Sequence, residues 1–231
     1  MKNSKKIILF SFLLLIIQIF AACGNPKADY KSIAESTTKQ HEALDTWAKT
    51  TLDSGTFDQK VEVITEYTKQ ELFKSELAAK LSAQLRDQEQ VEFKNGNIEK
   101  AYEMAKKIFG GMPLPENISI LAEVAKSYSK ITFDKKDYLK SVEASGQILQ
   151  LYWNEDAMSM KLAAEYELLK ANVSQNNLKD AKPYYDDILS VTALKGNENL
   201  AKKYRADTEK FSDKFPKDTK PENVPTATIA K

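Results

Sequence analysis

The residues best suited to catalysis are few in this chain, and their spacing forms no recognisable site. His41 is the only histidine, and the zinc motif that His41-Glu42 begins lacks its second histidine, because the fourth residue after His41 is Asp45. Asp186 and Asp187 are adjacent, so on a helix their side chains would point about 100° apart and would not share a site. The sequence contains no nucleophile elbow and no glycine-rich phosphate loop. We therefore expect a protein that is not an enzyme, holds no metal and uses no cofactor.

The single cysteine stands in a context that favours a different chemistry. Cys23 follows three lysines and an apolar run of about 14 residues that ends at Phe20, a length too short to span a membrane and suited to the apolar region of an export signal. Residues 20–24, with the sequence Phe-Ala-Ala-Cys-Gly, resemble the lipobox of a bacterial lipoprotein signal. The resemblance implies that residues 1–22 are removed and that the Cys23 thiol carries a diacylglyceryl thioether.

Lipidation at Cys23 would make a membrane the first partner of this chain. Each buried methylene contributes ~0.8 kcal/mol, and stable anchoring takes at least two acyl chains, which a diacylglyceryl group supplies. Gly24 stands where an aspartate would retain a lipoprotein in the inner membrane, so the resemblance implies the outer membrane of a cell with two membranes. In a cell with one membrane it implies the outer face of the plasma membrane. The alternative is an ordinary secretory signal cut after Ala22, with Cys23 left as a free thiol.

Composition limits the kinds of partner and predicts the fold class. Removal of residues 1–22 would leave 209 of the 231 residues and, with the loss of three lysines, would change the formal charge from +1 to −2. This near balance provides no basic surface for nucleic acid, and a lone cysteine excludes an internal disulfide. Glycine and proline are sparse between Lys27 and Phe215, whereas alanine, leucine, lysine and glutamate abound, which predicts helix throughout.

The chain is expected to contain four segments. Residues 1–22 would be the signal peptide, 23–28 the lipidated cysteine and a short tether, 29–215 an all-α domain, and 216–231 a disordered tail. The tail is predicted because prolines interrupt a polar stretch that has no apolar pattern. A first helix from about Asp29 to Leu52 and a last helix from about Asn197 to Phe215 would cap the helical array.

Polar turns recur along the helical region with a fixed period. Small residues fall early in three successive helices, at Ala101, Ser141 and Ala181, which are 40 residues apart, and Val61 extends the series backwards. Each small residue begins a face with members four and three residues apart, as one side of a helix requires. These faces are Ala101, Ala105 and Ile108; Ser141, Ser145 and Ile148; and Ala181, Tyr185 and Ile188. The period is typical of stacked helical hairpins; a non-repetitive helical bundle is the alternative.

Local signals place several helix ends. Ser75 is the expected N-cap of one helix, Pro115 opens another, and Glu155-Asp156 suits the acidic first turn of a third. Pro183 would be accommodated if its helix began near Asp180 and would otherwise bend that helix.

The stretch from Gly96 to Ala101, continued through Ala105, Ile108 and Pro113, resembles the tetratricopeptide-repeat (TPR) family. It shares the family's polar turn, small residue, helix-face spacing and terminal proline, with a period of about 40 residues where the family has 34. We therefore expect an all-α fold of tandem antiparallel helical hairpins, stacked as a short TPR-like solenoid.

The resemblance also implies where a partner would bind, because the first helix of each hairpin lines the concave face in that family. Five residues fall on or near this face: Glu123, Lys126, Lys130, Tyr166 and Lys170. Tyrosine and tryptophan there would anchor a partner, although buried tyrosines more commonly fill a core. The expected function is a lipid-anchored, non-enzymatic scaffold in envelope or outer-membrane protein assembly. The alternatives are a carrier lipoprotein that encloses a ligand or lipid, and a surface-exposed adhesin or antigen.

Overall fold

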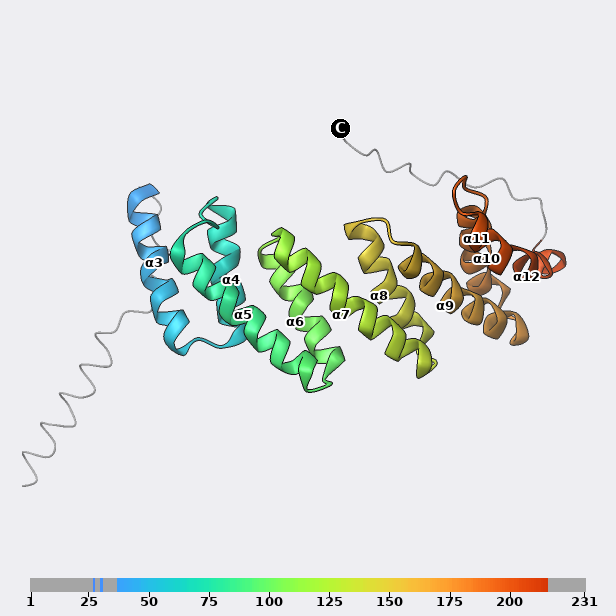
Figure 1. Ribbon diagram of the computed structural model, residues 1–231, viewed down its shortest axis with the longest axis horizontal. Coiled ribbons are helices and arrows are strands. Elements are labelled where there is room, and N and C mark those ends of the chain that lie inside the picture. Colours follow the sequence, from blue (N-terminus) through green and yellow to red (C-terminus); the bar gives the residue numbers. More distant parts are fainter. Residues whose placement is uncertain (1–26, 28–29, 31–36, 216–231) are drawn as a thin grey trace, which may run out of the picture. The chain divides into compact units, whose positions relative to one another are not determined.

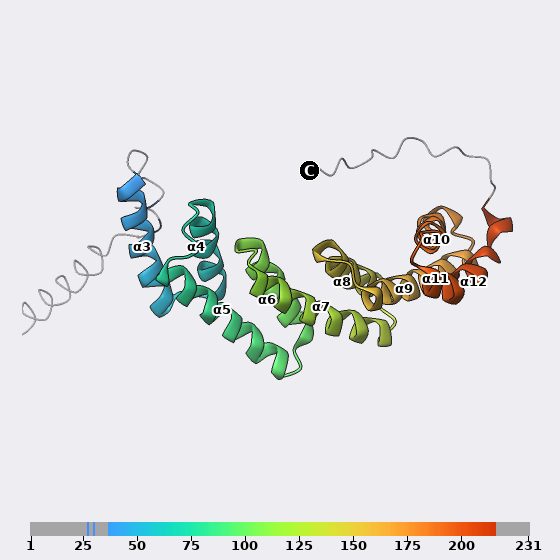
Figure 2. The ribbon, with the colours of Figure 1, turned by 45° about the horizontal axis from the view of Figure 1, so that its top comes forward.

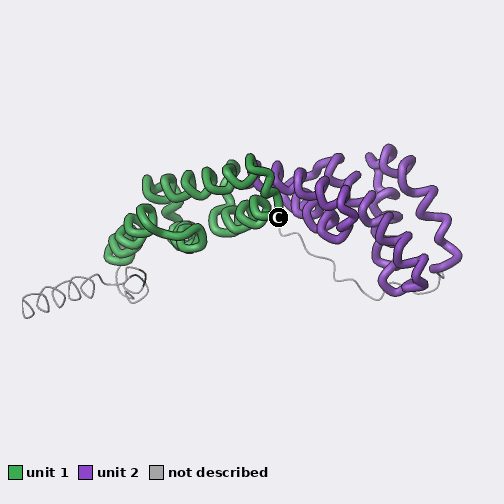
Figure 3. The backbone as a smooth tube through the Cα atoms, turned by 90° about the horizontal axis from the view of Figure 1, so that it is seen from below, with its two compact units in different colours: residues 1–117 green, residues 118–231 purple. Residues whose placement is uncertain are grey.

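The computed structural model describes Lys27, Tyr30 and residues 37–215, and every regular element in this part of the chain is helical. The predicted signal peptide, Cys23 and the predicted tail at 216–231 lie outside the described residues. The chain divides into two compact units, Met1–Asn117 and Ile118–Lys231, which Figure 3 draws in different colours. Each unit has an apolar core of its own.

Unit 1 is built from two helical hairpins. The helices are α3 (Thr37–Ser54) with α4 (Phe57–Lys69), and α5 (Glu76–Lys94) with α6 (Ile98–Gly111). The members of each pair contact one another and lie side by side in Figures 1 and 2. Leu44, Ile64, Leu81 and Leu85 are fully buried between them. Apolar faces from all four helices thus supply the core of this unit.

The N-termini of α4 and α5 are fixed by side-chain caps. Thr56 forms a capping box with Gln59, in which each side chain binds the backbone amide of the other residue. The Ser75 hydroxyl accepts a hydrogen bond from the Ala78 amide at 3.2 Å, which confirms the predicted N-cap of α5.

The first helix ends later than predicted, and a residue of the predicted tether is helical. The described helix α3 ends at Ser54, two residues beyond the predicted Leu52. Lys27, which falls in the predicted tether, is helical, and its Nζ lies 2.6 Å from a carboxylate oxygen of Glu62 on α4. Tyr30 donates a hydrogen bond to Glu66 at 2.9 Å. These contacts add residues near the N-terminus to the surface of unit 1.

Unit 2 contains two further hairpins. They are α7 (Pro115–Asp134) with α8 (Tyr138–Leu151), and α9 (Glu155–Ser174) with α10 (Leu178–Thr192). Most of α7 belongs to this unit, and its first three residues belong to unit 1. The predicted opening residue Pro115 and the predicted acidic first turn at Glu155-Asp156 both stand where the sequence indicated.

The C-terminal part of unit 2 is not the single helix predicted for Asn197–Phe215. It consists of α11 (Glu198–Leu200), the π-helical turn η1 (Ala201–Arg205), α12 (Ala206–Glu209) and the 3-10 turn η2 (Ser212–Lys214). A π-helical turn holds more residues than an α-helical turn, so it changes the direction in which the following side chains point. The prediction missed this interruption because every residue in the stretch tolerates a helix.

Pro183 lies inside α10 and not in its first turn. The helix begins at Leu178, two residues before the predicted Asp180, so Pro183 is its sixth residue. The missing amide hydrogen deprives the Lys179 carbonyl of its helical donor. Pro183 is exposed, which leaves that carbonyl close to water.

The turn inside each of the last three hairpins repeats one backbone conformation. Gly96, Lys136 and Asn176 have φ angles of 80°, 63° and 57°, all in the left-handed region, and are spaced 40 residues apart. In each turn the next amide donates to the carbonyl five residues earlier, at 3.0, 2.8 and 2.8 Å. This is the closing hydrogen bond of a Schellman motif, which satisfies a carbonyl that the helix end would leave free.

The predicted small residues are buried where the two helices of a hairpin meet. Ala101, Ser141 and Ala181 are fully buried, as expected of positions where backbones approach closely. In the α7–α8 hairpin the Ser141 and Ser129 hydroxyls lie 3.2 Å apart, and each lies within hydrogen-bond distance of the other residue's carbonyl oxygen. The structure thus confirms an all-α arrangement of helical hairpins with a period of 40 residues in the last three.

The first hairpin departs from this register. Val61 is only half-buried, and the buried face of α4 contains Lys60, Ile64 and Tyr67 instead. Lys60 precedes Ala101 by 41 residues, so the backward extension of the series to Val61 is wrong by one position. The lysine at this face is accommodated because its Nζ donates to the Gln84 side chain at 2.6 Å.

Candidate functional site

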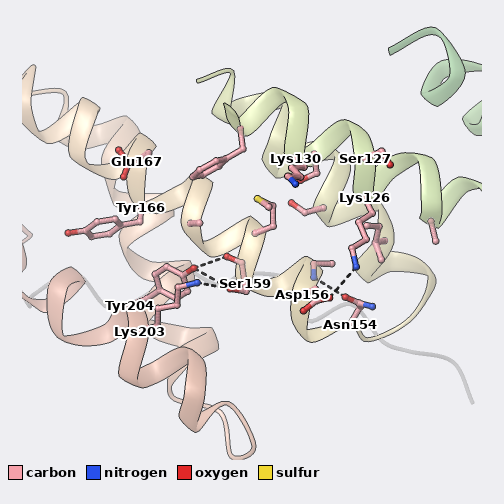
Figure 4. A pocket seen from close by; sticks show the side chains of 18 of the residues that line it. Lys126, Ser127, Lys130, Asn154, Asp156, Ser159, Tyr166, Glu167, Lys203 and Tyr204 are labelled. Carbon is pink, nitrogen blue, oxygen red and sulfur yellow. Dashed lines mark hydrogen bonds and ion pairs between the residues drawn. The ribbon is translucent and has the colours of Figure 1, made fainter. Parts of the chain in front are cut away.

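A groove with a volume of about 730 Å³ lies within unit 2 (Figure 4). Its lining side chains come from four elements: α7, the second half of α8 with the turn after it, α9 as far as Glu167, and η1. Pockets for small ligands commonly measure about 300–1,000 Å³, so the groove is large enough for a compact ligand or for several side chains of a partner.

Apolar side chains form most of the groove surface. On α9 the residues Met160, Ala163 and Tyr166 are three positions apart, so helix geometry places them on one side. Their neighbours are supplied by α7 and α8 and include Phe133, Ile148 and Tyr152. Tyr152 is 46% exposed, so a large aromatic surface is available to a ligand in this part of the groove.

The π-helical turn η1 contributes one wall of the groove and is joined to α9 through Ser159. Tyr204 donates a hydrogen bond to the Ser159 carbonyl at 3.0 Å, and its hydroxyl lies 3.2 Å from the Ser159 hydroxyl. The Lys203 ammonium donates to the same Ser159 hydroxyl at 3.2 Å, as the dashed lines in Figure 4 indicate. The turn therefore brings two consecutive side chains, Lys203 and Tyr204, to one groove.

The charged groups of the groove differ in whether they are paired. Lys126 lies 3.2 Å from Asp156 across the groove, and Glu167 lies 2.7 Å from Lys170. No carboxylate of the described residues forms an ion pair with Lys130 or Lys203. Both carboxylates of the lining are thus neutralised within the protein, whereas two of its three ammonium groups are not.

Three of the five predicted partner-binding residues line this groove. Lys126 and Lys130 on α7 and Tyr166 on α9 belong to its lining, and Figure 4 shows the Tyr166 ring extending away from Lys126 and Asp156. Glu123 is exposed on α7 but does not line the groove, although Ala122 and Lys126 on either side of it in the sequence do. Lys170 also lies outside the lining, although its ammonium stands 5.2 Å from the centre of the Tyr166 ring. Three of the five residues chosen from the TPR resemblance thus line the groove and two do not, and their contact with a partner stays a prediction.

Sequence reasoning missed the η1 side of the groove. Lys203 and Tyr204 were assigned only to a capping helix, and no signal in the sequence marks a π-helical turn. Their position depends on the tertiary contact with Ser159, which lies more than 40 residues earlier in the chain.

The face of α9 opposite the groove carries a buried charged cluster. Glu165 is 4% exposed, and one of its oxygens accepts a hydrogen bond from Lys161 at 2.6 Å. Lys161 also pairs with Asp187 on α10. The second oxygen, Oε2, has no hydrogen-bond partner among the described residues. Burial raises the pKa of Glu165 to about 7, with Lys161 opposing the rise and Asp187 adding to it.

The remaining candidates for chemistry are separated in the structure. Asp186 pairs with Lys182 at 2.8 Å while Asp187 pairs with Lys161, so the two adjacent carboxylates serve different partners. His41 is half-buried on α3, in unit 1. In the described ranges no group of three or more histidine, cysteine, aspartate or glutamate side chains is arranged to hold a metal ion.

Two further findings concern the chain as a whole. Among the helices that the structure describes, none combines the length and the apolar character needed to cross a membrane. No family model matches this chain, and no curated protein or solved structure matches it either.

Proposed function

We propose that this protein is a lipid-anchored, non-enzymatic scaffold of the bacterial cell envelope that binds a partner polypeptide in the groove of unit 2. The observation that carries the proposal is the convergence on one groove of side chains from the first helices of two successive hairpins, α7 and α9, with a wall from η1. Helix-borne side chains are held in place before a partner arrives, which lowers the entropy lost on binding.

Aromatic side chains would supply most of the binding free energy. Tyr152, Tyr166 and Phe133 offer large apolar surface with few rotatable bonds, and such residues dominate the energetics of protein interfaces. The lysines at the rim would affect the rate and specificity of association more than its strength.

The membrane anchor would act through Cys23, which lies outside the described residues. A diacylglyceryl group on Cys23 would confine the protein to a membrane surface, and confinement of both partners to one surface raises their effective concentration. The scaffold would in this way hold an envelope protein, including one being assembled into the outer membrane, against the bilayer.

The first test places a photo-crosslinking amino acid at Tyr166 in the full-length protein in its native host. A discrete protein adduct is expected at this position, because Tyr166 lines the groove. The matched control carries the same amino acid at Tyr184, a half-buried tyrosine of α10 outside the groove lining. Equal adducts at both positions, or none at Tyr166 in a correctly folded protein, would contradict the proposal.

The second test removes the anchor. Cys23→Ala should abolish incorporation of a labelled fatty acid, release the chain into the soluble fraction, and weaken the adduct at Tyr166 in the native host. Retention of the label in Cys23→Ala would show that the lipid is attached elsewhere, and absence of label from the unaltered protein would show that it carries none, in both cases independently of what the groove binds.

The groove volume favours a second candidate, the carrier of a small ligand or lipid. A volume of about 730 Å³ is within the common range for small-molecule sites. A carrier would be stabilised against heat by a small amphiphile and would give no protein adduct at Tyr166. A scaffold would show the opposite pair of results.

A further inference from the structure

The unpaired charges of the groove indicate the chemistry of what binds there. Lys130 projects from α7 and Lys203 from η1, so the two ammonium groups belong to different walls (Figure 4). The only carboxylates in the lining, Asp156 and Glu167, already pair with Lys126 and Lys170. An occupant would therefore meet two cations that the protein leaves without a counter-charge.

This positive groove contrasts with the charge of the whole chain. Without residues 1–22 the chain carries a formal charge of −2, so an acidic partner would gain nothing from the average field of the molecule. Attraction would be local, because charges separated by more than about 8–10 Å are screened at physiological salt. A local positive site on a weakly negative molecule favours recognition of acidic groups at that site alone.

The surface between the two lysines is mixed in character. Phe133, Ile148 and Met160 are apolar, while Asn154 and Ser127 add polar groups to the same lining. The Asn154 side-chain oxygen already accepts from the Ala157 amide, and the Ser127 hydroxyl already donates to the Glu123 carbonyl. An acyl chain would still cover the Asn154 amide hydrogens and the Ser127 oxygen without offering them hydrogen bonds, and dehydration of such groups costs free energy. A polypeptide brings backbone donors and acceptors to them. The lining thus favours a polypeptide over a simple lipid chain.

Resting on the function proposed above, we infer that the groove binds a polypeptide segment that combines apolar side chains with at least two carboxylates, one for Lys130 and one for Lys203. The apolar side chains cover the surface supplied by α8 and α9. The carboxylates lie at the two walls, so the segment crosses the groove between α7 and η1.

The test is an unbiased peptide selection with the full mature chain, anchored by its own lipid in lipid nanodiscs. A random 12-residue peptide library is selected against this protein, and the enriched peptides are synthesised with a fluorescent label. We expect aspartate or glutamate to be enriched together with aromatic or aliphatic residues. Replacing the acidic residues of a selected peptide by their amides should weaken binding about 10-fold at low salt and by less at high salt.

Paired variants connect the selection to the two lysines. Lys130→Gln with Lys203→Gln should lower the affinity of the selected acidic peptides about 10-fold. The control, Lys179→Gln with Lys195→Gln, removes the same charge from two exposed lysines of unit 2 outside the groove lining and should change affinity less than about 2-fold. Circular dichroism confirms that both double variants remain folded.

The possible failures can be told apart. Enriched peptides without an excess of acidic residues, or equal affinities for the two double variants, would overturn the acidic segment and leave a peptide-binding groove intact. A different result would overturn both this inference and the scaffold function. In that result no peptide is enriched, dodecanoate binds saturably, and bound dodecanoate blocks crosslinking by the photo-crosslinking amino acid at position 166. No enriched peptide and no dodecanoate binding would likewise count against the acidic segment.

Discussion

At the scale of single residues, Glu165 is the side chain whose burial has a measurable consequence for stability. Its pKa of about 7 in the folded chain exceeds the ordinary value of 4.5 because burial disfavours the carboxylate. Between these two pH values the folded chain binds more protons than the unfolded chain. The contribution of the neutral carboxyl to stability is therefore complete below pH 4.5 and is lost as the pH rises through 7.

We expect the free energy of unfolding to fall by on the order of 1–3 kcal/mol from this group between pH 5 and pH 8. Urea denaturation followed by circular dichroism at a series of pH values measures the change. Glu165→Gln is the control, because a neutral amide of similar shape cannot titrate and Lys161 keeps Asp187 as its partner. An unchanged pH dependence in Glu165→Gln would assign the effect to another residue.

Two adjacent glycines at the end of α6 provide a second residue-scale prediction. A Cβ atom on Gly111 would lie 2.8 Å from the Thr65 hydroxyl, which donates to the Val61 carbonyl, whereas a Cβ on Gly110 would meet nothing within 4 Å. Gly111→Ala should lower the free energy of unfolding by about 1 kcal/mol or more, because Thr65 must move. Gly110→Ala should raise it by up to about 1 kcal/mol through helix propensity.

Thermal or urea denaturation of these two variants measures the difference directly. Their opposite signs are the informative result, since the two positions share a helix end and differ only in the space available. If both variants were stabilised, α6 would approach α4 at Gly111 less closely than the 2.8 Å to the Thr65 hydroxyl requires.

At the scale of elements, the repeated turns predict the effect of changing a left-handed residue. Lys136 has a φ of 63°, which costs a non-glycine residue roughly 1 kcal/mol relative to glycine. Lys136→Gly should therefore raise the free energy of unfolding by up to about 1 kcal/mol, and Gly96→Ala should lower it by a similar amount. Lys135→Gly is the control, because Lys135 precedes the left-handed position and should give no gain.

The elements also show how far the sequence alone could predict this molecule. The hairpins, their period and the burial of Ala101, Ser141 and Ala181 could be predicted, because spacing along a helix determines which side chains share a face. These positions depend on local geometry, which the order of residue types specifies directly. Lys126, Lys130 and Tyr166 were instead expected at a binding face from the resemblance to the TPR family, and the groove that they line is formed by contacts between several elements.

The η1 turn could not be predicted, because it depends on contacts between distant segments. The residues Ala201–Arg205 have ordinary helix propensities, and their π-helical form accompanies the hydrogen bonds of Tyr204 and Lys203 to Ser159. Glu165 shows the same limitation. A helical wheel does not distinguish Glu165 from the exposed glutamates of the chain. Its burial follows from the packing of α9 against α10.

At the scale of the whole molecule, the separate cores of the two units predict how a local defect spreads. Leu162 belongs to the core of unit 2 and Leu81 to that of unit 1, and both are fully buried. Leu162→Ala should cost about 2–5 kcal/mol and should speed amide hydrogen exchange mainly in α9 and α10. Leu81→Ala should have the corresponding effect on α4 and α5.

Hydrogen exchange resolved along the sequence by mass spectrometry distinguishes the two patterns. Each variant is the control for the other, since the chemical change is the same and only the unit differs. Uniform loss of protection over all the described helices in either variant would mean that the chain opens as one cooperative body.

The spacing of Gly96, Lys136 and Asn176 has a consequence for how a gene of this kind can change length. Consider a deletion or duplication of 40 codons with both breakpoints in these turns. The left-handed residue of one turn would then be followed by the helix that, in this chain, follows the left-handed residue of a different turn. Reading frame, helix phase and the closing hydrogen bond of the turn would all be preserved at the junction. Unequal recombination at these points would therefore add or remove two helices at a time, the second helix of one hairpin and the first helix of the next, without creating a new helix end.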